Sequence, residues 1–359
     1  MGVYTPFVYT MLWPTYAIDW SLSRGIVIGS FMDEDQNEIE ILKNEEVQQV
    51  QGKESLGGVR FRSAGKTMRN LVYPVTKVLW KPCIYERKDK KMFASTGDAL
   101  RLWSVKEGLY EPIIEEMVLE HRQHGTNQIA PTTSFDWNQV AQQLIVTASV
   151  DTTCIIWDIE VGEAKSKLIA HDREVFDVSF LAHSADVFVS TGAEGSMRMF
   201  DLRSLEHSTI LYETGGELDA YTSEPLLRVS ANTLDQNLLA TFHLDSNVVH
   251  ILDIRFPGTP VLNIAGHDGN INCVKWAPGC RNICATGGED CQILIWNTTK
   301  ESQNPNTLLY KSIRNQEIKQ LNNPIFSWNA NSEINNLCWS DDAEWIGVCW
   351  GKNFQGLKV

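Results

Sequence analysis

The stretch Val150-Asp151-Thr152-Thr153-Cys154-Ile155-Ile156-Trp157-Asp158 decides the fold, because its pattern returns further along as Met197-Arg198-Met199-Phe200-Asp201. Between the two stretches, His171 precedes an apolar strand, and Ser190 lies in a strand of small residues. Trp157 and Phe200 are 43 residues apart. This spacing matches the ~40–45 residues of one four-stranded blade of a β-propeller. The stretch therefore predicts one blade, and we expect the unit to recur along the chain.

Two kinds of extended segment alternate along the whole sequence. The first kind is apolar, often ends in Trp, and occurs at 17–20, 77–80, 134–137, 176–180, 227–231, 272–276 and 336–339. The second kind is mostly aliphatic and occurs at 39–42, 100–103, 154–157, 197–200, 249–252, 293–296 and 354–357. Alternating side chains of this kind are typical of strands. Seven interleaved copies predict an all-β protein whose residues 1–359 form a single seven-bladed β-propeller.

The end of the chain predicts how the ring closes. The last blade has candidates for three strands only, whereas the apolar segment 3–11 precedes the first blade and belongs to none. We expect this segment to pair beside 354–359 as the fourth strand. Pro6 fits this position, because proline is tolerated in edge strands. Closure would remove the exposed sheet edges.

Two repeats, from Leu42 to Trp103 and from Trp296 to Leu357, are about 60 residues long and contain insertions near 48–70 and 298–331. A third, shorter insertion, polar and acidic, lies at 215–224. Their composition is polar or rich in glycine, so we expect inserted surface loops. Loops of this kind on a rigid scaffold often determine binding specificity.

Composition restricts the classes of function. The net charge of −14 argues against direct binding of nucleic acid, which needs clustered Lys and Arg. The eight cysteines form no Cys-x-x-Cys pair, which favours free thiols over a metal site. Neither a signal peptide nor an apolar run long enough for a membrane span is present. We expect a soluble intracellular protein that needs no cofactor or metal.

Four residues near the chain's sixth repeat stand at the spacing of the hydrogen-bonded tetrad of WD repeats: His267, Thr286, Asp290 and Trp296. Such a tetrad satisfies polar groups that a blade buries. Two other repeats are incomplete. The fourth has His171 and Ser190 but carries Glu194 and Phe200, and the third has Asp151 and Trp157 without a preceding His. A His, a hydroxyl and an Asp could also form a hydrolase triad, but the spacing and Trp296 favour the structural interpretation.

Asp201-Leu202-Arg203 and Asp253-Ile254-Arg255 end equivalent strands of successive repeats. An extended Asp-x-Arg places its carboxylate and guanidinium on one face, so a local salt bridge is one interpretation and a partner-binding site is the other. The sequence contains no nucleophile elbow, glycine-rich phosphate loop or His-Glu-x-x-His. We therefore expect no enzyme. A glycosidase-type carboxylate pair in the channel and an aromatic cage for methyl-lysine stay open as alternatives.

Several specific segments resemble one family of WD-repeat scaffolds, namely 13–21, 96–103, 133–138, 151–154, 169–172, 198–210 and 333–336. The run Leu205-Glu206-His207-Ser208-Thr209-Ile210 after Asp201-Leu202-Arg203 is the most distinctive of these. The family includes the plant Transparent Testa Glabra and anthocyanin-regulating proteins. Its animal member is an adaptor of DYRK-class kinases that is also grouped with cullin-four-associated factors.

The resemblance implies a non-enzymatic scaffold, present in cytoplasm and nucleus, that brings a DYRK-type kinase or regulators of the MYB and basic helix–loop–helix types to their partners. It also implies an alternative, in which the protein is a substrate receptor of a cullin-RING ubiquitin ligase. In that case Asp201, Arg203, Asp253 and Arg255 would dock the ligase adaptor. In both cases we expect a monomeric ring within larger protein complexes. The three predicted insertions and the residues 1–10 depart from the family, so partner choice can differ.

Overall fold

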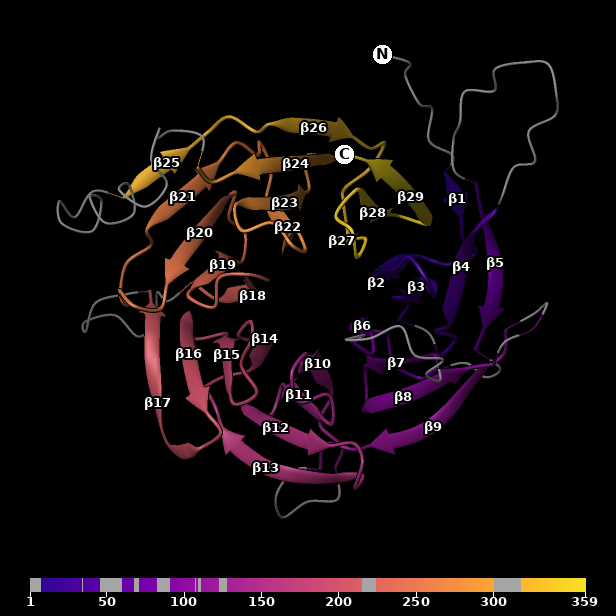
Figure 1. Ribbon diagram of the computed structural model, residues 1–359, viewed down its shortest axis with the longest axis horizontal. Helices are drawn as coiled ribbons and strands as arrows, with labels where there is room; N and C mark the ends of the chain where they lie inside the picture. Colours follow the sequence, from indigo (N-terminus) through magenta and orange to yellow (C-terminus); the bar gives the residue numbers. More distant parts are fainter. Residues whose placement is uncertain are drawn as a thin grey trace.

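The computed structural model describes residues 8–33, 35–45, 60–67, 71–82, 91–106, 108, 111–122, 128–214, 224–299 and 318–359. Every regular element in these ranges is a strand, and the strands form seven sheets arranged around a central channel (Figure 1). The predicted all-β, seven-bladed β-propeller is therefore confirmed. We label the four strands of each blade a to d from the channel outwards.

The blades follow each other in chain order. Blade 1 contains β2 (Thr15–Ser21), β3 (Gly25–Ser30), β4 (Ile39–Glu45) and β5 (Arg60–Lys66). Blade 2 contains β6 (Lys77–Trp80), β7 (Lys91–Thr96), β8 (Leu100–Val105) and β9 (Ile113–Leu119). Blade 3 contains β10 (Thr132–Trp137), β11 (Leu144–Ser149), β12 (Thr153–Asp158) and β13 (Glu163–Ile169). Blade 4 contains β14 (Val175–Phe180), β15 (Val187–Gly192), β16 (Ser196–Asp201) and β17 (Ser204–Glu213).

The last three blades depart more from this plan. Blade 5 contains β18 (Leu226–Ala231), β19 (Leu238–His243), β20 (Val248–Asp253), β21 (Leu262–Ala265) and a fifth strand, β25 (Lys319–Leu321). Blade 6 contains β22 (Ile271–Trp276), β23 (Ile283–Gly288), β24 (Gln292–Asn297) and β26 (Phe326–Asn329). Blade 7 contains β27 (Asn336–Trp339), β28 (Trp345–Trp350), β29 (Asn353–Lys358) and β1 (Tyr9–Thr10).

Burial along a blade explains why its strands differ in composition. In blade 3, β11 is buried throughout and consists of aliphatic and small residues, whereas β13 is mostly exposed and polar. The second strand lies inside the blade, between two other strands and between two neighbouring blades, so both of its faces are apolar. Large aromatic side chains fill the spaces between blades, and Trp103, Trp137 and Trp296 are among the largest fully buried ones.

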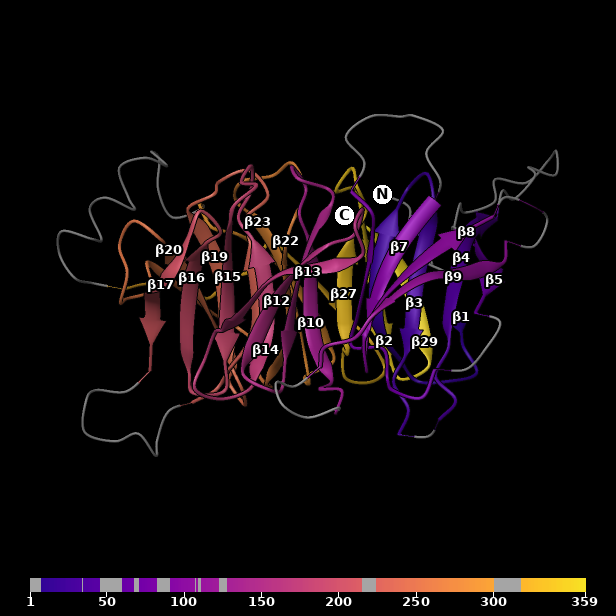
Figure 2. The ribbon, with the colours of Figure 1, turned by 90° about the horizontal axis from the view of Figure 1, so that it is seen from below.

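The ring has two faces. The b–c face carries the turns between strands b and c together with the connections from one blade to the next. The a–b face carries the a–b and c–d turns. In Figure 2 the ring is seen from its side, with the b–c face below and the a–b face above.

The N-terminal segment closes the ring, as predicted. β1 pairs antiparallel with β29, with Tyr9 opposite Phe354 and Thr10 opposite Asn353. The Met11 backbone N–H also donates to the Lys352 carbonyl at 2.7 Å. Residues 1–7, including Pro6, lie outside the described residues.

Two of the predicted insertions contain blade strands. The range 48–70 includes β5, the outer strand of blade 1, and the range 298–331 includes β25 and β26. These strands lie at the rim, where the composition is polar, and this hides them from a search for apolar patterns. β25 runs parallel to β21 of blade 5, from Leu262 opposite Lys319 to Ile264 opposite Leu321. Residues 46–59, 215–223 and 300–317 lie outside the described residues.

Seven cysteines belong to the described part of the chain, and all seven are free thiols. Burial raises the pKa of five of these thiols, and Cys273, Cys284 and Cys349 reach about 12. These cysteines pack as small apolar side chains. No helix long and apolar enough to cross a membrane occurs among the described residues.

Candidate protein-interaction sites

Blade 6 holds a complete hydrogen-bonded tetrad. His267 Nδ1 lies 2.9 Å from Asp290 Oδ2, and His267 Nε2 lies 2.7 Å from Thr286 Oγ1. The indole N–H of Trp296 donates to Thr286 Oγ1 at 2.9 Å. Burial lowers the pKa of His267, although Asp290 opposes this shift. The tetrad thus joins the connection before β22 to strands β23 and β24 through a buried neutral imidazole.

Blade 4 contains a variant of this arrangement. His171 Nε2 lies 2.6 Å from Ser190 Oγ, and His171 Nδ1 contacts Glu194 Oε1. Glu194 thus takes the place of the Asp, and Ser196 also donates to its Oε1 at 2.6 Å. Phe200 cannot donate to Ser190 and stacks on Phe188 instead, with ring centroids 5.0 Å apart.

The sequence interpretation that blade 3 has no preceding His is wrong, because His121 contacts Asp151. His121 Nε2 lies 3.1 Å from Asp151 Oδ1 and 2.6 Å from Thr153 Oγ1. The Trp157 indole donates to Thr147 Oγ1 at 2.9 Å. His121 escapes detection because eleven positions separate it from the start of β10, whereas His171 and His267 each precede their strand by four.

The tetrad hydroxyls of blades 4 and 6 are buried, which favours a structural role over a catalytic one. Thr286 and Ser190 have no exposed surface, so neither hydroxyl can meet a substrate as the nucleophile of a hydrolase. Burial tends to raise the pKa of Asp151, but hydrogen bonds from His121 and Thr153 outweigh it and hold the pKa below its usual range. Buried polar groups of this kind must pair with one another to avoid a large desolvation cost.

The two Asp-x-Arg motifs form local salt bridges in the c–d turns of blades 4 and 5. Asp201 accepts from Arg203 Nε at 2.9 Å and from Nη2 at 2.6 Å. Asp253 accepts from Arg255 Nε at 2.8 Å and from Nη2 at 2.5 Å. The Arg203 side chain is 71% exposed, whereas Asp253 is fully buried. The hydrogen bonds from Arg203 lower the pKa of Asp201 to about 2.

Both motifs lie on the a–b face of adjacent blades. The Leu202 N–H donates to the Asp186 carbonyl at 2.7 Å, and the Ile254 N–H donates to the Asn237 carbonyl at 2.9 Å. Each motif is therefore fixed to the neighbouring a–b turn of its own blade. The guanidinium groups are held in place by their carboxylates while part of their surface remains open to solvent. This geometry allows further contacts to a carboxylate or carbonyl of another molecule.

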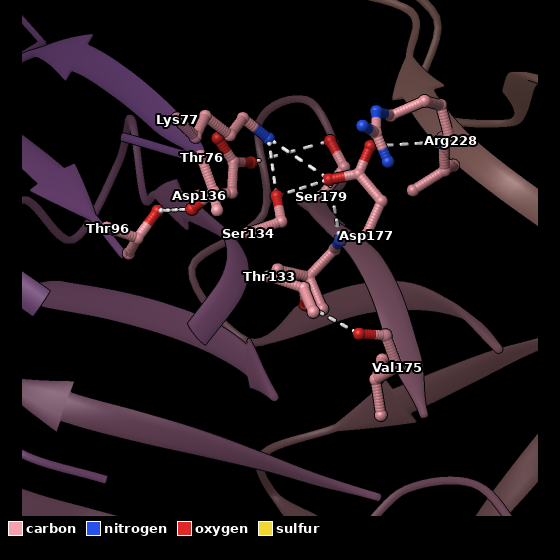
Figure 3. Close-up of polar contacts among 12 residues, drawn as sticks. Thr76, Lys77, Thr96, Thr133, Ser134, Asp136, Val175, Asp177, Ser179 and Arg228 are labelled. Carbon is pink, nitrogen blue, oxygen red and sulfur yellow. Dashed lines mark hydrogen bonds and ion pairs between the residues drawn. The ribbon is translucent and has the colours of Figure 1, made fainter. Parts of the chain in front are cut away.

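The channel contains a network of charged side chains that the sequence patterns do not reveal (Figure 3). Asp177 Oδ1 accepts from Lys77 Nζ at 3.2 Å and from Ser134 Oγ at 2.5 Å. Figure 3 shows Lys77 and Arg228 on opposite sides of Asp177. Burial tends to raise the pKa of Asp177, but the positive charges of Lys77 and Arg228 outweigh it and lower the pKa.

Three channel carboxylates also link their blade to the next one. Asp19 Oδ2 accepts from the Trp80 N–H at 2.7 Å, and Asp136 Oδ2 accepts from the Phe180 N–H at 2.7 Å. Asp177 Oδ2 accepts from the Val229 N–H at 3.0 Å. The innermost strand of a blade has no neighbour on its channel side, so its N–H groups need acceptors from elsewhere. These three carboxylates supply them, which is a structural role.

The surroundings of the channel carboxylates can be compared with those that a glycosidase-type carboxylate pair would need. The channel cavity has a volume of about 220 Å³, and its lining includes Asp19, Asp136, Lys77 and Lys275. Each of the two carboxylates therefore lies near the positive charge of a lysine and accepts a hydrogen bond from a backbone N–H. Burial raises the pKa of Asp19 to about 6 and also raises that of Asp136.

The other alternative, a site for methyl-lysine, would have to accept a cation in the same channel. The ammonium groups of Lys77 and Lys275 would repel such a side chain. Among the described residues, no three His, Cys, Asp or Glu side chains are grouped to hold a metal ion.

Comparison with known proteins agrees with this architecture. The model of the WD domain, G-beta repeat, matches residues 258–297. An uncharacterised WD repeat-containing protein of Schizosaccharomyces pombe is 38% identical, over 98% of this chain and 89% of its own length. A WD repeat-containing protein of Saccharomyces cerevisiae is 34% identical, over 98% of this chain and 76% of its own length.

A third relative covers the chain from end to end. The DDB1- and CUL4-associated factor 7 homolog of Dictyostelium discoideum is 38% identical, over 98% of both chains. The matched region therefore includes all seven blades and not a single repeat. With this identity over nearly the full length, and with the tetrads and the closed ring in place, the chain belongs to the WD-repeat protein family.

Proposed function

We propose that this protein is a non-enzymatic scaffold that holds a DYRK-type kinase together with transcription regulators of the MYB or basic helix–loop–helix type. The observation that carries the proposal is how the polar groups are distributed. The channel carboxylates and the tetrads are occupied by contacts within the ring, whereas exposed side chains lie on the turns of both faces. A rigid ring with two accessible faces can bind two proteins at once.

The Transparent Testa Glabra likeness supports the choice of partners, and it rests on the sequence segments alone. The proposed places of action are the cytoplasm and the nucleus. The test is to purify the intact protein from its own cells under mild conditions and to identify the bound proteins. Recovery of a kinase or a transcription regulator in amounts comparable to the scaffold supports the proposal. Purification of the protein without either class of partner contradicts it.

A second candidate function is that of a substrate receptor in a cullin-RING ubiquitin ligase. Two observations favour it. The relative from Dictyostelium is named for association with DDB1 and CUL4. Arg203 is exposed on the a–b face of blade 4, and Arg255 lies on the same face of the adjacent blade 5. Both guanidinium groups are held in a fixed orientation by their carboxylates.

Reversing both charges tests this second function. We expect the double variant Arg203→Glu, Arg255→Glu to bind purified DDB1 at least tenfold more weakly than the wild type, which corresponds to about 1.4 kcal/mol. The control is Arg281→Glu, because Arg281 is also exposed on the a–b face and pairs with Asp235, but belongs to no Asp-x-Arg motif. Unchanged affinity of the double variant, with an intact circular dichroism spectrum, would show that the motifs do not dock the adaptor.

A further inference from the structure

Four large apolar side chains are exposed on the b–c face around blade 1. Leu12 is 82% exposed, Val72 57%, Tyr73 44% and Phe31 43%. Leu12 lies in the connection from β1 to β2, Phe31 in the b–c turn of blade 1, and Val72 and Tyr73 in the connection from β5 to β6. We call these four residues the apolar arc. Exposed apolar side chains that gather in one place often mark an interaction site.

Direct contacts join the first two segments. The Phe31 N–H donates to the Pro14 carbonyl at 3.0 Å, and the Trp13 indole donates to Glu38 Oε2 at 3.1 Å. The Phe31 ring packs on Tyr16 with centroids 4.8 Å apart. The connection that carries Leu12 therefore lies directly against the turn that carries Phe31.

The third segment is fixed to the other side of the same turn. Asn37 and Leu71 exchange backbone hydrogen bonds of 3.0 and 2.7 Å, and the Val75 N–H donates to the Ser30 carbonyl at 3.0 Å. Val72 and Tyr73 lie between these two anchor points. Asn37 itself is fully buried, and its side chain accepts from the Ser30 hydroxyl at 2.8 Å. The arc is thus held in position before any partner arrives, which lowers the ordering cost of binding.

The turn that carries Phe31 is strongly acidic. It reads Phe31-Met32-Asp33-Glu34-Asp35-Gln36-Asn37-Glu38, with four carboxylates and no basic residue. Asp33 and Asp35 are exposed. The nearby ammonium of Lys352 donates to the Leu12 carbonyl at 2.9 Å. Together with the net charge of −14, this turn repels nucleic acid and anionic membranes and attracts Lys and Arg.

We infer that the apolar arc and the acidic turn together form a docking site for a short segment of a partner protein, one that combines apolar side chains with Lys or Arg. The inference rests on the proposed scaffold function and specifies the kind of segment that this part of the ring holds. The apolar side chains of the partner would cover Leu12, Phe31, Val72 and Tyr73, and its cations would meet Asp33 and Asp35.

Two synthetic peptides test the inference with the full-length protein. Both contain Leu and Phe at the same positions, and the remaining positions are Lys in one peptide and Glu in the other. We expect saturable binding of the Lys peptide only, and at least a tenfold loss of its affinity in the Leu12→Lys, Val72→Lys variant. The control is Val161→Lys, because Val161 is 67% exposed but lies in a c–d turn on the opposite face.

A second variant tests the contribution of charge. Asp33→Asn with Asp35→Asn should weaken binding of the Lys peptide about threefold to tenfold and make it less sensitive to salt. The inference is wrong if the arc variant and Val161→Lys bind the Lys peptide equally, or if the Glu peptide binds as tightly as the Lys peptide.

Purification from cells separates this inference from the scaffold proposal. If the wild type recovers a kinase or a regulator, and the arc variant recovers the same proteins and binds the Lys peptide normally, only the docking site is refuted. If the wild type recovers neither class while peptide binding depends on the arc, the scaffold proposal fails and the docking site stands.

Discussion

At the scale of single residues, Thr286 shows how one hydroxyl can organise a blade. Its Oγ1 accepts from the Trp296 indole and lies 2.7 Å from His267 Nε2. With His267 neutral, as its lowered pKa indicates, the hydroxyl donates to Nε2, and the proton on Nδ1 points to Asp290. One small side chain therefore satisfies two buried polar groups from different parts of the repeat.

Replacing Thr286 with Ala should lower the free energy of unfolding by roughly 2–4 kcal/mol, because the Trp296 and His267 nitrogens would both be left buried without a partner. Thr286→Ser is the matched control, since it keeps the hydroxyl and loses only a methyl group. Urea denaturation of the three proteins measures the difference. Equal losses for Ala and Ser would show that the hydroxyl contributes nothing.

Asp19 should make the stability of the ring depend on pH. Its pKa in the folded protein is about 6, above the ordinary value of 3.8 for an aspartate, so the folded protein binds this proton more tightly than the unfolded chain. The resulting contribution to stability is complete below pH 4 and is lost as the pH rises through 6. A shift of about two pKa units corresponds to roughly 3 kcal/mol.

The Asp19→Asn variant removes this effect while keeping an acceptor for the Trp80 N–H. We expect its stability relative to the wild type to rise by up to roughly 3 kcal/mol between pH 4 and pH 7. Asp201→Asn serves as a control, because the pKa of Asp201 is lowered to about 2. The contribution of Asp201 to stability therefore changes only below pH 4. If the free energies of unfolding of Asp19→Asn and the wild type change with pH in the same way, the prediction is contradicted.

At the scale of strands, the apolar pattern predicted what is buried and missed what is polar. All seven inner strands and all seven third strands were found at the expected positions, because each faces neighbouring blades and must be apolar. The outer strands β5 and β13 are largely polar at the rim, so their sequences resemble loops.

Sequence patterns also missed contacts that depend on the ring as a three-dimensional object. Asp19 and Trp80 are 61 positions apart, and Lys77 and Asp177 are 100 apart, yet each pair meets in the channel. Nothing in the local sequence distinguishes these inward-facing charges from charges on a surface strand. The Asp201–Arg203 pair, in contrast, could be predicted because both residues belong to one short extended segment.

At the scale of the whole molecule, stability depends on closure by the N-terminal segment. Deleting residues 1–10 removes the pairing of Tyr9 and Thr10 with β29, and also the 3.0 Å hydrogen bond from the Tyr9 hydroxyl to Glu40. We expect the melting temperature to fall and association to become concentration-dependent, because the edge of β29 is then open to other chains. Thr10→Ala is the control, since it removes only the side-chain bond to Asn353. An unchanged melting temperature after the deletion would contradict this role of β1.

The path of the chain around β25 has a mechanical consequence. After β24 in blade 6, the chain returns to the outer edge of blade 5 as β25 and then comes back to blade 6 as β26. The polypeptide therefore crosses between blades 5 and 6 in both directions. It does so in no other neighbouring pair of blades among the described residues. A force applied to the C-terminus would first detach β29 from β1 and unfold the other strands of blade 7. Blades 5 and 6 would then unfold together, giving a larger single step in a pulling experiment.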